Sequence, residues 1–139
     1  MKKVLLLLVM FGMLSAVTPG YAADVDGAWL VSIPSKPIAA LAMLRANGGQ
    51  LLATWCGWDN GNMDFWGAFL GPFDGTNGQI SLILTSQAIA DRLPQSMTGN
   101  FTLTSATTAT FTPTSCIDFP GHDDCVGTVG LLIQFEKLF

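Results

Sequence analysis

Short runs in which apolar and polar residues alternate recur along this chain, and turn-forming residues separate them. In the run 27–33, for example, Trp29, Val31 and Ile33 share one parity, and Pro34 follows directly. A period of two places successive side chains on opposite faces of a β-strand. The recurrence of this pattern predicts an all-β protein in which each strand buries one face.

Eight such runs set the expected order of strands. They cover residues 27–33, 38–46, 50–58, 63–70, 79–85, 97–104, 107–112 and 126–137. Asn47-Gly48-Gly49 favours a tight hairpin between the second and third runs, because Asn and Gly accept positive φ. The segment 86–95 lies between the fifth and sixth runs and is the one place where a helix is also possible. Ser86 could cap a helix of about two turns that Pro94 ends.

The connections between the runs decide how the strands pair. Most are tight turns, and none offers the long helical crossover that parallel strands require. Closure of the sheet removes the unpaired edges that a meander would otherwise leave. We therefore expect an antiparallel up-and-down meander of about eight strands, forming a small closed or partly open barrel, with a β-sandwich as the alternative.

The N-terminus has the pattern of a secretory signal peptide. Two lysines precede an apolar stretch over residues 4–17, and Gly20 and Ala22 occupy the small-residue positions before a cleavage site. A stretch of about fourteen residues is too short to span a bilayer, which takes about 20. We predict cleavage of residues 1–22 and a single β domain over 23–139 that is secreted or periplasmic and has no membrane span.

Charge restricts the partners of this domain. Removal of the signal peptide leaves four basic and ten acidic residues, a net charge of −6. Nucleic-acid binding depends on basic side chains that neutralise phosphates, so nucleic acid is excluded as a partner. Adhesion to an anionic membrane is disfavoured for the same reason.

The cysteines are consistent with an oxidising compartment. Cys116 and Cys125 bracket a segment whose Pro120-Gly121 favours a turn, and we predict a disulfide between them. In the chain-entropy model, closing a loop of this length stabilises by roughly 2 to 3 kcal/mol. Cys56 is left over, either as a buried apolar side chain or as a reactive or intermolecular thiol, unless it pairs with one of the other two.

The supply of acid–base groups is small. After the signal peptide, His122 is the one histidine and Glu136 the one glutamate, and no Gly-x-Ser-x-Gly motif accompanies them. His122 lies near Asp118, Asp123 and Asp124, which suggests a metal site, but adjacent loop carboxylates are usually solvated. We expect a non-catalytic protein with no metal and no cofactor.

Aromatic residues are concentrated in one part of the chain. Trp55, Trp58 and Trp66 fall within twelve residues. Core packing is the ordinary explanation, but Trp55 and Trp58 are an odd number of positions apart and must face opposite sides of a regular strand. We expect Trp58 and Trp66, which flank the turn at 59–62, to form a contact site.

Gly27-Ala28-Trp29 resembles the Gly-x-Trp motif that opens calycin barrels such as lipocalins and avidin-like proteins. The expected strand number and chain length are also similar. The resemblance implies a barrel that holds a small ligand, with Trp29 near it.

Two functions are therefore expected. The first is an exported binding protein for an apolar or aromatic small ligand, with Trp29, Trp58 and Trp66 as contacts. The alternative is an extracytoplasmic interaction protein, such as an inhibitor or an envelope accessory subunit, that presents the disulfide loop 116–125 to a protein partner.

Overall fold

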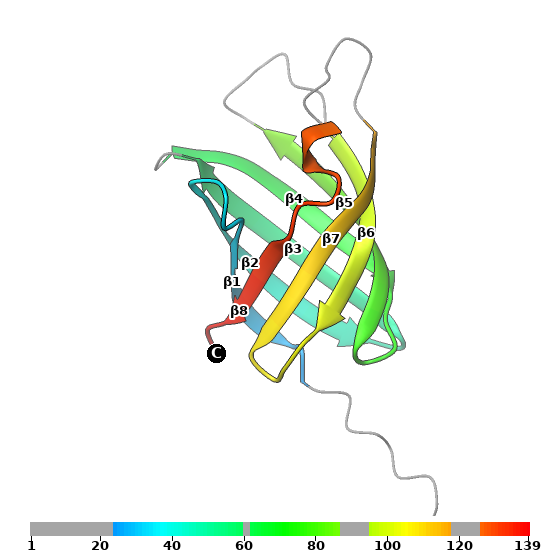
Figure 1. The fold of residues 1–139 in the computed structure, drawn as a ribbon. Helices are drawn as coiled ribbons and strands as arrows, with labels where there is room; N and C mark the ends of the chain where they lie inside the picture. The colour runs from blue at the N-terminus through cyan, green and yellow to red at the C-terminus, as the bar shows by residue number, and fades with distance from the viewer. Residues whose placement is uncertain (1–23, 60–61, 87–94, 118–125) are drawn as a thin grey trace, which may run out of the picture.

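A computed structural model describes residues 24–59, 62–86, 95–117 and 126–139. The described elements are β1 (Gly27–Ser32), β2 (Ile38–Asn47), β3 (Gln50–Asp59), β4 (Asn62–Pro72), β5 (Asn77–Ser86), β6 (Gln95–Leu103), β7 (Thr108–Ile117), the 3-10 turn η1 (Val126–Thr128) and β8 (Ile133–Lys137). Each strand pairs antiparallel with the next, and β8 pairs with β1 (Figure 1). The all-β meander barrel is therefore confirmed, and the sandwich alternative is not adopted.

The barrel has two ends of different construction (Figure 1). The strand ends that flank 33–37, 60–61, 87–94 and 118–125 lie at one end, which we call the loop end. The turns at 48–49, 73–76 and 104–107 lie at the opposite end, the hairpin end, together with Asp24 and Phe139. Gly48 and Gly49 both have positive φ, 58° and 77°, as the predicted Asn-Gly-Gly turn requires.

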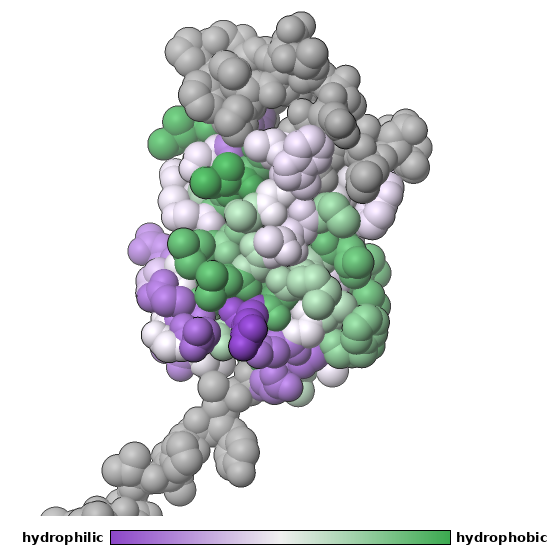
Figure 2. Space-filling view, turned by 180° about the vertical axis from the view of Figure 1, so that it is seen from behind, coloured by the Kyte–Doolittle hydropathy of each residue, from purple (hydrophilic) through white to green (hydrophobic). Residues whose placement is uncertain are grey.

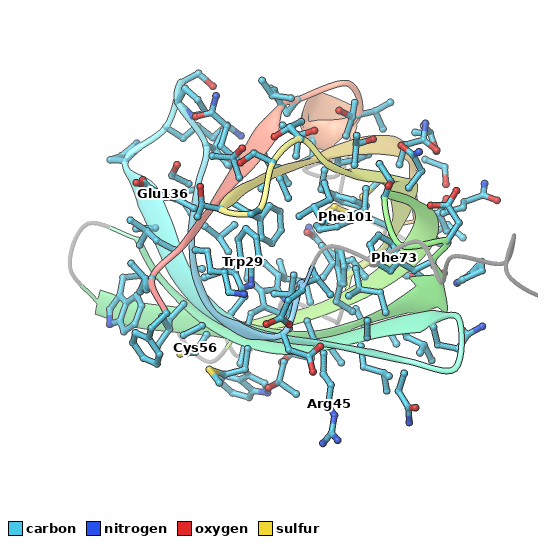
Figure 3. All side chains as sticks on the ribbon, turned by 90° about the horizontal axis from the view of Figure 1, so that it is seen from below. Trp29, Arg45, Cys56, Phe73, Phe101 and Glu136 are labelled. Carbon is cyan, nitrogen blue, oxygen red and sulfur yellow. The ribbon has the colours of Figure 1, made fainter. Side chains whose placement is uncertain are left out.

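Phenylalanine rings fill much of the barrel interior. Phe69 lies at the centre, with its ring centroid 5.7 Å from that of Phe101, 5.4 Å from that of Phe111 and 6.2 Å from that of Phe135. Phe73 packs edge-to-face on Phe101 at 5.9 Å. Burying each such ring stabilises by roughly 1.5 to 3 kcal/mol. Figure 3 shows inward and outward side chains together, with Trp29, Phe73 and Phe101 inside the barrel and Arg45, Cys56 and Glu136 outside it.

Strand β7 runs farther than the sequence indicates. The predicted run ends at Thr112, but β7 continues through Pro113 to Ile117. The pairing between β6 and β7 shifts by one residue at this point. Thr98 pairs with Ser115, but the next residue of β6, Gly99, pairs with Pro113. This bulge adds one residue to β7 and reverses the alternation of its side chains. Cys116 consequently packs against the core.

The last strand is shorter than expected. Residues 126–128 form η1, and β8 begins only at Ile133. Gly130 has a φ of 80°, a conformation that a regular strand does not contain. Val129 is consequently exposed, whereas Phe135, within β8, is buried.

Several predictions concern segments outside the described residues. The signal peptide 1–22 is one of them, and it stays a prediction. The helix alternative over 86–95 falls mainly on 87–94, and the structure describes Ser86 and Gln95 as strand ends. Within the described ranges, no helix is long and apolar enough to cross a membrane.

Candidate functional site

The inward-facing side chains are buried to different degrees along the barrel. Toward the hairpin end, Trp29, Leu51 and Phe101 are fully buried. Toward the loop end, Trp55 and Ile133 also pack on the core but remain partly exposed. Trp55 and Ile133 are therefore inward-facing side chains that retain some exposure, unlike Trp29, Leu51 and Phe101.

The N-terminal segment of the described chain packs against Trp29 and Lys137 at the hairpin end. Val25 is buried, and its carbonyl oxygen accepts a hydrogen bond of 2.9 Å from the indole nitrogen of Trp29. Lys137 lies over the same indole, with Nζ 5.8 Å from the ring centroid, and donates a hydrogen bond of 2.8 Å to the carbonyl oxygen of Asp24. These contacts hold the N-terminal segment against the core at the hairpin end.

Trp55 is the large inward side chain of β3 nearest the loop end. It pairs across the sheet with Ala42 on β2 and Gly67 on β4. A Cβ atom at Gly67 would overlap Nε1 of Trp55 as well as the carbonyl oxygen of Ile83. Because Gly67 has no side chain, the indole of Trp55 can lie over Gly67 on the inner face of the barrel wall.

Small residues surround this indole on the inner face of the wall. Ala40 and Gly57 face each other on β2 and β3, one step closer to the loop end, and both are buried. An eight-stranded barrel has an interior that either fills with side chains or holds one small ligand. We call this set the Trp55 cluster, and its members are Ala40, Ala42, Trp55, Gly57 and Gly67. Its chemistry is apolar contact and aromatic stacking.

The three tryptophans predicted to bind a ligand do not share one surface. Trp29 is 0% exposed and lies in the core, whereas Trp66 is 45% exposed and points outward. Trp58 is half-buried and pairs with the exposed Ala39, so it also faces outward, near the loop end. Ligand contact by these three stays a prediction. Trp55 is not among the residues predicted from the sequence, although its parity with the buried Leu51 and Ala53 indicates an inward direction.

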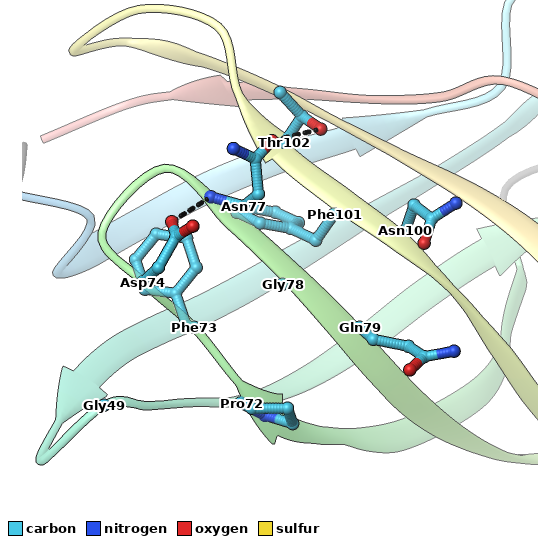
Figure 4. A pocket seen from close by; sticks show the side chains of 10 residues that line it. All are labelled: Gly49, Pro72, Phe73, Asp74, Asn77, Gly78, Gln79, Asn100, Phe101 and Thr102. Carbon is cyan, nitrogen blue, oxygen red and sulfur yellow. Dashed lines mark hydrogen bonds between the residues drawn. The ribbon is translucent and has the colours of Figure 1, made fainter.

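A groove of about 700 Å³ lies at the hairpin end, between the β4–β5 turn and β6 (Figure 4). The Asp74 carboxylate accepts hydrogen bonds from the backbone nitrogens of Asn77, at 2.7 Å, and Thr76, at 2.8 Å. These bonds lower the pKa of Asp74 below its ordinary 3.8. The Thr102 hydroxyl donates to Oδ1 of Asn77 at 3.1 Å. The polar groups on this side of the groove thus stabilise the turn.

Cys56 and Cys116 lie on opposite faces of the barrel wall. Cys56 is a free thiol, half-buried, and faces outward. Cys116 is not free, and it pairs across the sheet with Met97. Cys125 lies outside the described residues, so the disulfide between Cys116 and Cys125 stays a prediction.

The candidate metal ligands and the candidate catalytic base also lie beyond what the structure describes. His122 and its acidic neighbours fall in 118–125, and the described ranges contain no group of three metal-ligating side chains. The Trp55 cluster, by contrast, is formed entirely by described residues. No protein-family model, curated protein or solved structure matches this chain.

Proposed function

We propose that this protein is an exported, non-catalytic binding protein that holds an apolar or aromatic small molecule at the loop end of its barrel. One observation carries the proposal: Trp55 faces the interior across Gly67 and remains partly exposed, whereas Trp29, Leu51 and Phe101 toward the hairpin end are fully buried. The closed antiparallel barrel is also compatible with the calycin resemblance at Gly27-Ala28-Trp29. That resemblance supports small-ligand binding as the function.

The composition of the cluster determines the ligand class. Its members carry no charge and, apart from the indole nitrogen, no polar side-chain atom. Burial of apolar surface stabilises a complex by roughly 25 cal/mol per Å², and stacking of two aromatic rings adds about 0.5 to 1.5 kcal/mol. A neutral ligand with one or two rings therefore gains the most at this position.

The test is equilibrium binding of a neutral aromatic dye, N-phenyl-1-naphthylamine, to the mature protein. We expect saturable binding that the Trp55→Ala substitution weakens about tenfold or more, since loss of a stacking partner costs about 1.4 kcal/mol. Trp66→Ala is the matched control, because it removes an outward indole from the neighbouring strand. Equal affinities of the Trp55→Ala variant and the unmodified protein would contradict the proposal.

A second candidate is an interaction protein that presents the loop 116–125 to a protein partner. One observation favours it: the bulge in β7 directs Cys116 into the core, so the loop leaves the barrel from a fixed point. A rigid attachment lowers the cost of ordering a loop on binding. Deletion within 117–124 should then abolish partner binding and leave dye binding unchanged.

A further inference from the structure

The outer surface of the barrel is divided into an apolar part and a polar part. Large exposed apolar side chains gather on β2 to β5, and they are Met43, Leu52, Trp66, Leu70 and Ile83, each between 44% and 53% exposed. Figure 2 shows hydrophobic residues gathered on the side of the barrel seen from behind. The outer positions of β6 and β7 are instead rich in hydroxyl and amide groups, including Thr98, Asn100, Thr102, Thr108, Thr110 and Thr112.

Strand register arranges the apolar part into three parallel rows that cross β2, β3, β4 and β5. The first row is Leu41, Cys56, Trp66 and Thr85; the second is Met43, Thr54, Ala68 and Ile83; and the third is Arg45, Leu52, Leu70 and Ser81. We call these twelve residues the outer face. Neighbours within a row are about 4.8 Å apart, and adjacent rows are about 7 Å apart.

The centre of the outer face carries short side chains, and longer side chains surround them. Thr54 and Ala68 are neighbours in the middle of the second row, between the longer side chains of Met43 and Ile83. The third row places two leucines beside them, and the first row places Trp66 on the other side. The face therefore carries both short side chains and the longer ones that could pack over them.

We infer that the outer face binds a second copy of this chain in a two-fold symmetric dimer. In such a dimer the same patch meets itself, so it must supply both the projecting and the receding parts of the contact. The short side chains of Thr54 and Ala68 and the longer ones of the adjacent Leu52 and Leu70 meet this requirement. A two-fold axis that lies in the contact plane between the second and third rows places Leu52 and Leu70 of each copy over Thr54 and Ala68 of the other.

The charge and the area of the outer face also support a second copy of this chain as its partner. Arg45 is the one charged residue of the twelve, and it stands at a corner, so the acidic chain meets its copy across a face that contains no acid. Five half-exposed side chains of this size leave on the order of 500 Å² of apolar surface per copy. Together with their neighbours they reach the lower range of specific interfaces, roughly 1,200 Å² in total. The dimer is therefore expected to be reversible, with a dissociation constant in the micromolar range.

The experiment is sedimentation velocity of the mature protein from about 1 µM to about 100 µM, a range that brackets a micromolar dimer. We expect a monomer–dimer equilibrium whose midpoint the Leu70→Lys substitution raises at least tenfold. Leu132→Lys is the matched control, because Leu132 is 45% exposed, against 52% for Leu70, and lies outside the outer face. The midpoint of the monomer–dimer equilibrium should be the same for Leu132→Lys as for the unmodified protein.

Ile83→Lys, at the end of the second row, is an independent variant that should weaken the dimer in the same direction. The unfolding free energies of all three variants show whether each is folded. A protein that stays monomeric up to the highest concentration overturns the inference, as does an equal effect of Leu70→Lys and Leu132→Lys. Loss of lipid-vesicle binding in a Leu70→Lys variant of a monomeric protein would assign the face to a membrane instead.

Discussion

The indole of Trp55 on β3 occupies the space that a Cβ atom at Gly67 on β4 would need. This pairing of a large ring with the smallest residue fixes the ring against the wall at the loop end. Similar pairing occurs deeper in the barrel, where a Cβ atom at Gly99 would lie 2.7 Å from Cζ of Phe111. Glycine on one strand thus accommodates an aromatic ring from its neighbour.

Substitution of Gly67 should therefore displace Trp55. We expect Gly67→Ala to lower the free energy of unfolding by about 1 to 3 kcal/mol, the usual cost of overpacking, and to shift the tryptophan emission. Urea denaturation monitored by fluorescence measures both effects. Gly127→Ala is the control, because a Cβ atom there meets nothing within 4 Å and should change stability by less than about 0.5 kcal/mol. Equal effects of the two substitutions would contradict this account of Trp55.

The hydrogen bond from Trp29 to Val25 should contribute measurably to stability. Trp29→Phe keeps an aromatic ring but leaves the buried Val25 carbonyl without its donor, at a cost of about 1 to 3 kcal/mol. Chemical denaturation gives the value, and Trp66→Phe on the outer surface serves as the comparison. If Trp29→Phe is no more destabilising than Trp66→Phe, the hydrogen bond does not hold the N-terminal segment in place.

Asp74 should make the stability depend on pH in acid. Backbone hydrogen bonds from Asn77 and Thr76 hold its folded-state pKa below 3.8. Its contribution is therefore fully present above the unfolded value near 3.8 and is lost as the pH falls through the lower, folded-state pKa. Unfolding measured from about pH 6 to about pH 2 should show a shallower acid loss for Asp74→Asn than for the unmodified protein. Identical pH profiles of the two proteins would show that these hydrogen bonds do not stabilise the ionised form of Asp74 preferentially.

The thiols should differ in reactivity. Under native, non-reducing conditions we expect iodoacetamide to modify Cys56 alone, because Cys56 is the free thiol and Cys116 is predicted to pair with Cys125. Peptide mass spectrometry locates the label. The double substitution Cys116→Ser with Cys125→Ser should lower stability by roughly 2 to 3 kcal/mol. Labelling of Cys116 in the unmodified protein would disprove the predicted pair.

Much of the fold follows from the alternation of side chains. The period of two in the segment around Phe101 and in the segment around Ile80 and Leu82 identified strands and their inward faces, and all three residues are buried. Turn chemistry at Asn47-Gly48-Gly49 identified a hairpin for the same local reason. These features depend on residues close together in the sequence.

Other features depend on partners far along the chain. Pro113 reads as the end of a strand, yet β7 continues because a bulge opposite Gly99 accommodates a residue without a backbone N–H. Trp55 became a candidate only when the register placed it opposite Gly67, twelve positions later. Sequence alone offered three tryptophans as one site, and it could not show that Trp29 and Trp66 lie on opposite sides of the wall.

The four indole N–H groups offer the most direct test of the proposed function. Their resonances in a ¹H–¹⁵N correlation spectrum, assigned by single Trp→Phe substitutions, report separately on the core, the loop end and the outer surface. On addition of N-phenyl-1-naphthylamine we predict that the Trp55 resonance shifts most, in a saturable way, and that those of Trp29 and Trp66 stay nearly unchanged. A saturable shift confined to Trp66, or no shift at Trp55 in the presence of saturating dye, would contradict a ligand site inside the barrel.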